Sequence, residues 1–281
     1  MKFVVLGANG CLGQEFREFL GDAHYYCDKS ECDVTDINSL RGYLSNKKDI
    51  SGIINCAAGR DAELLENDYE LAYKIGVTAI ENLSVCSNEL DVPLIHFSSD
   101  YVFDGKKSSP YSEGDLTNGL SIYGKTKAVG EQTALSKANK VIVFRIAWLL
   151  SRKGNKSFIN TISNLLAQGK NLTVVFDQVG SPTIAKDLVR HIIDDVWPQI
   201  DVTKNFQKIY NLTNEGVCSW YDLAVYIKKK LNLPGNVVPV LSSEYPSKIK
   251  RPSYSVLDKS KIKNDINILI RHWSLGLDEI L

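Results

Sequence analysis

Short, continuous apolar runs alternate with helical segments along the first 150 residues. The apolar runs are KFVVLG (2–7), HYYCD (24–28), GIINCAA (52–58), PLIHFSS (93–99) and KVIVFRIAWLL (140–150). Strands that read as unbroken apolar runs are typical of a parallel sheet buried on both faces. Helical segments between such strands imply right-handed crossovers. The pattern therefore predicts an α/β fold built on a Rossmann-like, doubly wound parallel sheet.

The helical segments are predicted from the spacing of apolar positions and from end signals. In the first half they cover 11–21, 34–47 with Thr35 or Asp36 as cap, about 63–90, and the segment around Tyr123. After residue 150, helices are predicted at about 157–168, 185–196 and 219–231, and strands within 172–183 and 208–212. The polar segment 239–262 is expected to be loop-rich. This second half predicts a smaller α/β C-terminal lobe, interleaved with the sheet domain.

Composition narrows the function classes without choosing among them. Lysine plus arginine and aspartate plus glutamate both number 33, and no basic stripe predicts a nucleic-acid partner. No apolar run has membrane-spanning length. The six cysteines are scattered, without a C-x-x-C pair or zinc-like spacing with the histidines. We expect reduced thiols, no metal site and a cytoplasmic protein.

A glycine loop, GANGCLG, separates the first predicted strand from the first predicted helix. Gly7, Gly10 and Gly13 occupy every third position. Glycine permits a tight turn and close backbone approach to a ligand, and free amides at a helix start bind phosphate. The context predicts a dinucleotide site, with cofactor contacts also expected from Asn9, Cys11 and Leu12.

The end of the second strand bears on the choice of cofactor. Asp28 there would bind ribose hydroxyls and favour NAD, whereas Lys29 would accept a 2′-phosphate and favour NADP. The two residues favour different cofactors, so the choice between NADP and NAD stays open, with NADPH slightly preferred. Further cofactor contacts are expected from Asp33, Val34 and the small residues Ala57, Ala58 and Gly59.

Polar side chains gather at the end of the fourth strand and on the following helix. Ser98, Ser99 and Asp100 follow an apolar run, and ligands bind at the carboxyl ends of parallel strands. Tyr123 and Lys127 are four residues apart, hence neighbours on one helix face. This set predicts carbonyl reduction, in which Tyr123 donates a proton to the developing alkoxide. Lys127 is expected to lower the pKa of Tyr123, and Ser99 to orient the carbonyl oxygen.

Several motifs together resemble the extended short-chain dehydrogenase/reductases and, among them, the dTDP-4-dehydrorhamnose reductase family. The similarity runs nearly end to end and is carried by SSDYVFDG, YGKTKAVGE, FRIAWLL, DQVGSPT and KRPSYSVLD. It implies an NAD(P)-binding domain over 1–150 with returning segments at about 180–215, and a mainly substrate-binding lobe over 151–281. It also implies a nucleotide-sugar substrate, a possible homodimer, and catalytic roles for Ser99, Tyr123 and Lys127.

The resemblance implies substrate contacts as well, and the chain departs from the family near some of them. The implied contacts are Arg60, Ser98, Asp100, Val102, Trp148, Arg251 and Tyr254. Arg60 replaces a family threonine, Gly76 a family asparagine, and Ile146 and Ala147 a hydroxyl-bearing pair. These changes leave the predicted proton-transfer groups intact and bear on which sugar is bound.

The expected function is NAD(P)H-dependent reduction of the 4-keto group of a nucleotide-linked 6-deoxy sugar. The resemblance favours conversion of dTDP-4-dehydrorhamnose to dTDP-L-rhamnose for surface polysaccharide. One alternative is a reductase of a different nucleotide 4-keto sugar. Another is a non-catalytic NAD(P)-binding subunit, similar to the regulatory subunit of methionine adenosyltransferase.

Overall fold

The computed structural model describes residues 1–59, 62–154, 157–247 and 249–281. Its main feature is a six-stranded sheet in the order β10-β5-β4-β3-β1-β2. Every neighbouring pair is parallel. The strands are β1 (Lys2–Leu6), β2 (Tyr25–Cys27), β3 (Ile50–Asn55), β4 (Leu94–Ser99), β5 (Lys140–Ile146) and β10 (Phe206–Asn211). The predicted α/β, doubly wound parallel sheet is confirmed.

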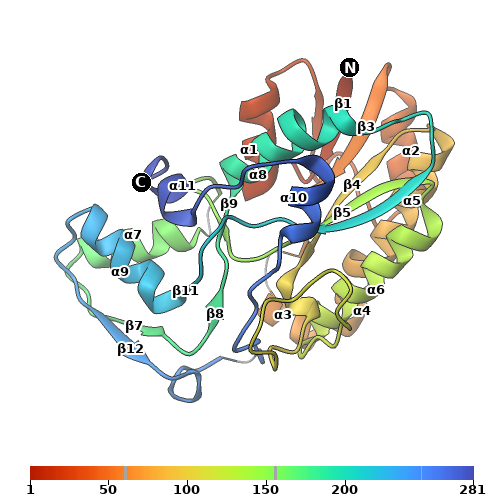
Figure 1. Cartoon of the computed structure of the whole chain (residues 1–281). Coiled ribbons are helices and arrows are strands. Elements are labelled where there is room, and N and C mark those ends of the chain that lie inside the picture. The colour runs from red at the N-terminus through yellow and green to blue at the C-terminus, as the bar shows by residue number, and fades with distance from the viewer. Residues whose placement is uncertain (60–61, 155–156, 248) are drawn as a thin grey trace.

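Each face of this sheet is covered by helices (Figure 1). Phe3 and Val5 join one apolar cluster, and Val4 and Leu6 join the other, because side chains alternate along a strand. The first cluster contains residues of α1 (Cys11–Leu20), α8 (Ala185–Arg190), the π-helical turn η3 (His191–Val196) and α10 (Ser260–Ile266). The second contains residues of α2 (Ile37–Ser45), α5 (Ala79–Glu89) and α6 (Ile122–Lys137).

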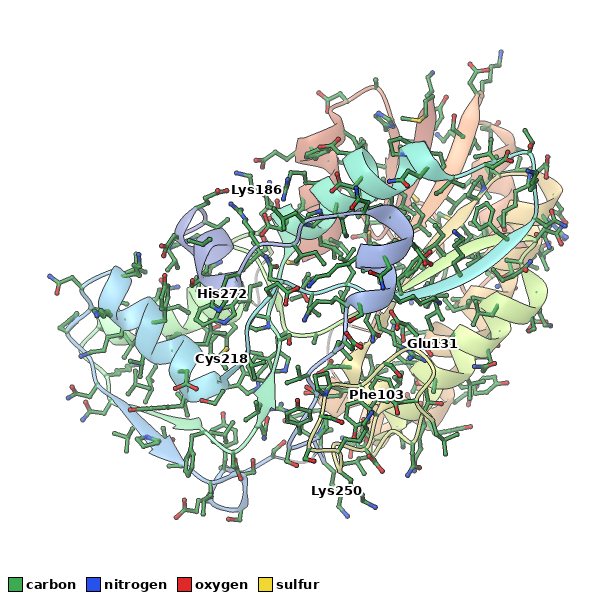
Figure 2. All side chains as sticks on the ribbon, in the orientation of Figure 1. Phe103, Glu131, Lys186, Cys218, Lys250 and His272 are labelled. Atoms are coloured by element: carbon green, nitrogen blue, oxygen red, sulfur yellow. The ribbon has the colours of Figure 1, made fainter. Side chains whose placement is uncertain are left out.

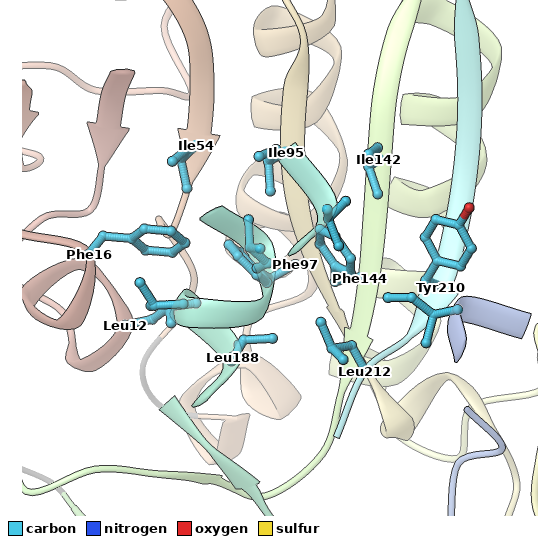
Figure 3. Close-up of a cluster of buried hydrophobic side chains, with 14 of the residues drawn as sticks. Leu12, Phe16, Ile54, Ile95, Phe97, Ile142, Phe144, Leu188, Tyr210 and Leu212 are labelled. Atoms are coloured by element: carbon cyan, nitrogen blue, oxygen red, sulfur yellow. The ribbon is translucent and has the colours of Figure 1, made fainter. Parts of the chain in front are cut away.

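Figure 3 shows the first cluster, in which side chains of α1 and α8 face those of the strands. Leu12 and Phe16 come from α1 and Leu188 from α8, and all three are buried. Burial of such side chains is worth about 1.5–3 kcal/mol each. The packing fixes the start of α1 relative to the strand ends.

The predicted helix over 63–90 is wrong as a single element. It is divided into α3 (Ala62–Asn67), α4 (Tyr69–Tyr73), the π-helical turn η1 (Lys74–Thr78) and α5. Asp68 separates the first two, because its carboxylate accepts the amide hydrogen of Leu71 at 2.9 Å and so caps a new helix. η1 lies against α6, where a Cβ at Gly130 would be 2.1 Å from the Gly76 carbonyl oxygen.

The predicted strand over 140–150 also stops early. It ends at Ile146, and Trp148 has a φ of +48°, in the left-handed region. The chain then forms β6 (Leu149–Leu150), which pairs with β9 (Thr183–Ile184) in a separate sheet. A bulky residue at positive φ is uncommon and directs the chain out of the main sheet.

The C-terminal lobe lies beside the strand ends and has its own apolar core (Figure 1). It contains α7 (Phe158–Ala167), β7 (Leu172–Val175), β8 (Val179–Gly180), β11 (Cys218–Ser219), α9 (Trp220–Lys230) and β12 (Val237–Val240). β7 and β12 are parallel, and β8 and β11 antiparallel. Ser219 and Asp222 cap α9 reciprocally. The sequence pattern did not predict the late helices α10 and α11 (Trp273–Asp278).

The remaining elements are single turns of 3₁₀ helix, namely η2 (Asp100–Val102), η4 (Trp197–Gln199) and η5 (Ser242–Glu244). Within the described ranges, every helix is too short or too polar to cross a membrane. η2 directly follows β4 and contributes to the site below.

Candidate active site

The glycine loop joins β1 to α1 and lies against the end of β3. Gly7 has a φ of +74°, and a Cβ there would lie 2.6 Å from the amide nitrogen of Ala57. A Cβ at Gly13 would lie 2.4 Å from the carbonyl oxygen of Gly7. Gly10 is the N-cap of α1 and offers no side-chain acceptor to the first-turn amides. Amides of this kind suit the pyrophosphate of a dinucleotide.

The other predicted cofactor residues, beside the glycines and after β2, have packing or hydrogen-bonding partners of their own. Leu12 and Val34 direct their side chains toward the two cores of the sheet. The Asn9 carbonyl oxygen accepts the side-chain amide of Gln14 at 2.9 Å. Burial raises the pKa of the Cys11 thiol to about 11, so the thiol stays neutral.

Small residues continue from the end of β3 toward α3. Ala58 is exposed and Gly59 half-buried. A Cβ at Gly59 would lie 2.5 Å from a methyl carbon of Leu65. Arg60, the predicted replacement of a family threonine, lies outside the described residues.

The end of β2 carries charges of both signs. The Asp28 carbonyl oxygen accepts the amides of Glu31 and Cys32, which forms a tight turn. Lys29 is exposed, and its ammonium lies 3.6 Å from an Asp33 carboxylate oxygen. Burial raises the pKa of Asp33, but hydrogen bonds and Lys29 outweigh it and hold this pKa below its usual value. The edge therefore offers both an acid and a cation to an adenosine ribose.

The predicted proton-transfer residues come together where β4 ends and α6 begins. Ser121 caps α6 by accepting the amide of Gly124 at 3.1 Å, which places Tyr123 in the first turn and Lys127 one turn later. The Lys127 ammonium is buried and donates to the Phe97 carbonyl oxygen at 2.9 Å. Tyr123 is half-buried, as a residue that exchanges a proton with a ligand must be.

The pKa values of these groups depend first on burial. Burial raises the pKa of Tyr123 to about 12, a hydrogen bond with Ser99 lowers it, and the charge of Asp100 raises it further. Burial lowers the pKa of Lys127 to about 8, and Glu131 opposes this change. The expected lowering of the Tyr123 pKa by Lys127 is therefore not the main influence on that pKa. The Lys127 ammonium is turned toward the backbone of β4 instead.

Ser99 and Asp100 form a buried pair at the start of η2. The Ser99 hydroxyl donates to Asp100 Oδ1 at 3.0 Å and accepts the amide of Tyr101 at 3.2 Å. Burial raises the pKa of Asp100 to about 6, and side-chain hydrogen bonds from Ser255 and Ser99 lower it. Among the described residues, Asp100 Oδ2 has no hydrogen-bond partner. At neutral pH the Asp100 carboxylate is mostly charged.

Some buried polar atoms at the end of β4 and in the C-terminal segment have no hydrogen-bond partner that the structure describes. Within the described chain they include Ser98 Oγ, Asp100 Oδ2, His96 Nε2 and Arg251 Nε. Burial raises the pKa of Tyr101, and the charge of Arg251 opposes this change. Unpaired buried polar atoms are rare and costly except where a ligand or water satisfies them. The residues present therefore fit a polar ligand.

Two buried residues near Lys127 were missed by the sequence reasoning. His96 Nδ1 lies 3.1 Å from Asn55 Nδ2, and burial followed by the charge of Lys127 lowers the pKa of this histidine well below its usual value. The only sequence signal was a histidine inside an apolar run.

Glu131, labelled in Figure 2, was missed as well. Its carboxylate accepts two hydrogen bonds from Arg145, at 2.9 and 2.7 Å, and the two side chains are 0% and 3% exposed. Its spacing of four residues from Lys127 was an available signal.

The predicted substrate residues lie in different surroundings. Val102 is fully buried in a cluster with Phe103, so its side chain serves packing. Trp148 is half-buried and stacks on Trp220, with ring centroids 3.8 Å apart and an angle of 10°. A Cβ at Gly180 would lie 2.7 Å from the Trp148 ring.

The positions that depart from the family also have structural roles. A Cβ at Gly76 would be 3.0 Å from the Thr126 side chain, between Tyr123 and Lys127 on α6. Ala147 is buried and exchanges hydrogen bonds with the Thr183 hydroxyl.

Tyr254, a predicted substrate residue, is half-buried, and its segment pairs with Val179.

The doubly wound sheet, the glycine loop and the Tyr–Lys pair at the strand ends are the arrangement of an extended short-chain dehydrogenase/reductase. Comparison with known proteins makes the assignment specific. The model of the RmlD substrate binding domain family matches residues 1–281, and the chain belongs to this family.

Similar proteins cover the whole chain. It is 32% identical over 284 residues to the spore coat polysaccharide biosynthesis protein SpsK of Bacillus subtilis, covering 100% of this chain and 96% of SpsK. It is 32% identical over 290 residues to a dTDP-4-dehydrorhamnose reductase of Aggregatibacter actinomycetemcomitans, covering 99% of this chain and 98% of that reductase. The crystal structure of the Bacillus anthracis dTDP-4-dehydrorhamnose reductase with NADP has a TM-score of 0.92 at 30% identity. The match covers 99% of this chain and 98% of the Bacillus anthracis chain.

The protein is therefore an NAD(P)-dependent reductase of the RmlD family that acts on nucleotide sugars. This confirms the expected enzyme class. It also sets aside the alternative of a non-catalytic regulatory subunit.

Proposed function

We propose that this chain reduces the 4-keto group of a nucleotide-linked 6-deoxy sugar, with dTDP-4-dehydrorhamnose as substrate and dTDP-L-rhamnose as product, for surface polysaccharide. The observation that carries the proposal is the convergence of Ser99, Tyr123 and Lys127 at the end of β4. It is supported by the similarity to the Aggregatibacter dTDP-4-dehydrorhamnose reductase. Residues 1–150, with returning segments at about 180–215, would hold the cofactor, and 151–281 mainly the sugar.

NADPH or NADH supplies the hydride when bound. The first-turn amides of α1, at Cys11, Leu12 and Gly13, would bind its pyrophosphate, while the Gly10 amide closes the turn onto the Gly7 carbonyl oxygen. Asp28 would bind ribose hydroxyls, and Lys29 would accept a 2′-phosphate, as a basic residue near this position does in NADP-binding folds. The mixed charge at the end of β2 fits the use of both cofactors, with NADPH slightly preferred.

Tyr123 is the proposed proton donor. A pKa of about 12 keeps the phenol protonated at neutral pH, which is the state a general acid needs. Lys127, buried and mostly charged below its pKa of about 8, would hold the nicotinamide ribose. Ser99 would hydrogen-bond the carbonyl oxygen of the sugar and orient it.

Arg251 and Trp148 are proposed to hold the substrate. The unpaired Nε of Arg251 suits the pyrophosphate of a nucleotide sugar, and the flat Trp148 ring suits the apolar face of a sugar. Ser98, Tyr254 and Arg60 complete the proposed sugar contacts, whereas the buried Val102 side chain is not among them.

A reductase of a different nucleotide 4-keto sugar is the second candidate. The observations that favour it are the similarity to SpsK and the glycine at position 76, where the family has asparagine. A homodimer is the proposed assembly, and light scattering at several protein concentrations tests it.

The experiment measures cofactor oxidation through the absorbance of the reduced nicotinamide. The reaction contains dTDP-4-dehydrorhamnose and either NADPH or NADH. We expect turnover by the wild type and a loss of roughly 10²–10⁴-fold in Tyr123→Phe, with cofactor affinity unchanged. Tyr226→Phe is the matched control, because it removes a hydroxyl from α9, where its partner is Asp278. Full turnover by Tyr123→Phe would exclude the proton-donor role. Cofactor binding without turnover would exclude this substrate and direct the assay to other nucleotide 4-keto sugars.

A further inference from the structure

The Trp148 indole is covered on both of its faces. It stacks on the Trp220 indole, with ring centroids 3.8 Å apart and an angle of 10° between the two planes. A Cβ at Gly180 would lie 2.7 Å from Trp148 Cε2 and 2.9 Å from each of the atoms bonded to it, Cζ2 and Nε1. A point beside the ring edge would be nearer to the two outer atoms than to Cε2. Gly180 therefore lies over a face of the ring.

Two groups cannot occupy the same face at these distances, so Trp220 and Gly180 hold the Trp148 ring between them. Gly180 is in β8 and pairs with Cys218 of β11, and Trp220 begins α9 directly after β11. These elements lie together in the C-terminal lobe (Figure 1). We call the space between Gly180 and the Trp220 ring the indole slot. Glycine in a strand is typical of a place where another group approaches closely.

The side chain in the indole slot comes from the sheet domain. Trp148 follows β5, and its φ of +48° is a conformation that a bulky residue keeps only when its surroundings hold it. Its carbonyl oxygen accepts the amide of Thr183 at 3.1 Å. The Trp148 ring packs against the core of the C-terminal lobe and also against the cluster that contains Val102 and Phe103. Trp148 thus connects the end of the main sheet with the lobe.

The indole slot is close in the fold to residues of the proposed site. η2 directly follows Ser99, and its Val102 belongs to the cluster on which Trp148 packs. Tyr254, a proposed sugar contact, packs on the same cluster. The Tyr254 segment pairs with Val179, the residue before Gly180. The backbone that forms one side of the slot is therefore one strand position away from the backbone that carries a proposed sugar contact.

We propose that Trp220 and Gly180 are positioning residues of this reductase, which rests on the proposed function: by holding the Trp148 indole they fix the C-terminal lobe relative to β4, where the sugar meets Tyr123. In this role neither residue contacts the sugar. The arrangement narrows the sugar contact proposed for Trp148 to the part of its ring that the slot leaves exposed. A misplacement of about 1 Å can cost about 100-fold in rate, so a loosely held lobe should lower kcat.

The first test measures kcat and KM in Trp220→Phe and Trp220→Leu, with the sugar that the wild type reduces. Phenylalanine keeps a flat ring that can stack on Trp148, whereas leucine is apolar without a flat face. We expect kcat to fall about tenfold or more in Trp220→Leu and less than about threefold in Trp220→Phe. The Kd for NADPH should stay within about twofold in both variants, because the glycine loop is distant. A rise in KM alone would mean that Trp220 contacts the sugar and would overturn the positioning role.

Trp197→Leu is the matched control. Trp197 is also a half-buried tryptophan with an aromatic neighbour, since its ring centroid lies 4.6 Å from that of Phe3. It packs near the start of β1, whereas the site is at the carboxyl ends of the strands. The control should lose stability in thermal unfolding and keep the kcat and KM of the wild type. Equal losses of kcat in Trp197→Leu and Trp220→Leu would mean a general loosening of the fold and would exclude a specific role of the slot.

Gly180→Ala tests the other side of the slot. Moving the new Cβ from 2.7 Å to an ordinary contact of 3.4 Å displaces the Trp148 ring by 0.7 Å, and Trp220 blocks that movement. We expect kcat to fall here as well. In a Trp220→Leu background the same change should lower kcat little further, because the ring is no longer held on both faces. An unchanged kcat in Gly180→Ala would overturn the inference, even if Trp220→Leu does not fold.

Hydrogen exchange separates this inference from the proposed function. If the wild type reduces no tested sugar, the proposed function fails, and amide exchange then decides the inference. The Thr183 amide donates to the Trp148 carbonyl oxygen at 3.1 Å, and the Val179 amide to the Ser253 carbonyl oxygen at 2.8 Å. Both amides should exchange faster in Trp220→Leu than in the wild type and the control. Equal exchange rates in all three proteins would show that the slot does not hold the lobe and would overturn the inference.

Discussion

Replacing Gly13 by alanine tests whether the close packing of the glycine loop creates the cofactor site. The Cβ of alanine would lie 2.4 Å from the Gly7 carbonyl oxygen and 2.6 Å from Ala8 Cα. Both contacts are backbone, so no flexible side chain can move aside. Moving the first contact from 2.4 Å to 3.4 Å, an ordinary van der Waals distance, requires a displacement of 1.0 Å.

The displacement separates α1 from the loop and moves the first-turn amides that are proposed to bind the cofactor phosphates. Overpacking of this kind costs about 1–3 kcal/mol, which the helix preference for alanine over glycine offsets by about 1 kcal/mol. Each hydrogen bond to a charged phosphate is worth about 1.5–3 kcal/mol. We therefore expect the Kd for NADPH to rise about 10- to 100-fold in Gly13→Ala, with a smaller loss of stability.

The assay is a calorimetric titration with NADPH, which measures the Kd. Denaturant unfolding measures the free energy of unfolding. Gly42→Ala is the matched control, since Gly42 is exposed in α2 and a Cβ there meets nothing within 4 Å. The control should bind NADPH as the wild type does and gain about 0.5–1 kcal/mol in the free energy of unfolding. NADPH affinity within about twofold of wild type in Gly13→Ala would refute the reasoning.

Two further predictions concern charged residues. Glu131→Gln should lower the free energy of unfolding by about 3–5 kcal/mol, because it leaves the buried Arg145 guanidinium without its counter-charge; denaturant unfolding measures this. Glu81→Gln breaks an exposed pair and should cost less than about 1 kcal/mol, and equal losses in the two variants would contradict the role of burial. Lys29→Ala should raise the Kd for NADPH about two- to fivefold and leave that for NADH unchanged, as measured by calorimetry. An equal change for both cofactors would mean that Lys29 does not meet the 2′-phosphate.

Local sequence patterns were sufficient to predict the first strand, the glycine loop and the first helix. The apolar run over residues 2–6 and the glycines at positions 7, 10 and 13 impose their conformations within a few bonds. The pairing of Tyr123 with Lys127 also followed from spacing alone, because α-helical geometry is fixed. These features needed no knowledge of distant contacts.

Other boundaries depended on competition between local and distant interactions. The long predicted helix is interrupted because the Asp68 side chain caps a new start, an outcome that apolar spacing does not encode. The fifth strand ends because Trp148 takes a left-handed backbone and stacks on Trp220. The second ring comes from a segment more than 70 residues away in the printed sequence.

The sequence by itself determined the sheet architecture and placed Ser99, Tyr123 and Lys127 at one edge. Only the tertiary structure decided how those groups are tuned. It turned the Lys127 ammonium to a strand carbonyl and buried Asp100 beside Ser99. The physical reason is that pKa values and hydrogen-bond directions depend on desolvation and on the partners that surround a group. Those partners are brought together by the packing of elements far apart along the chain.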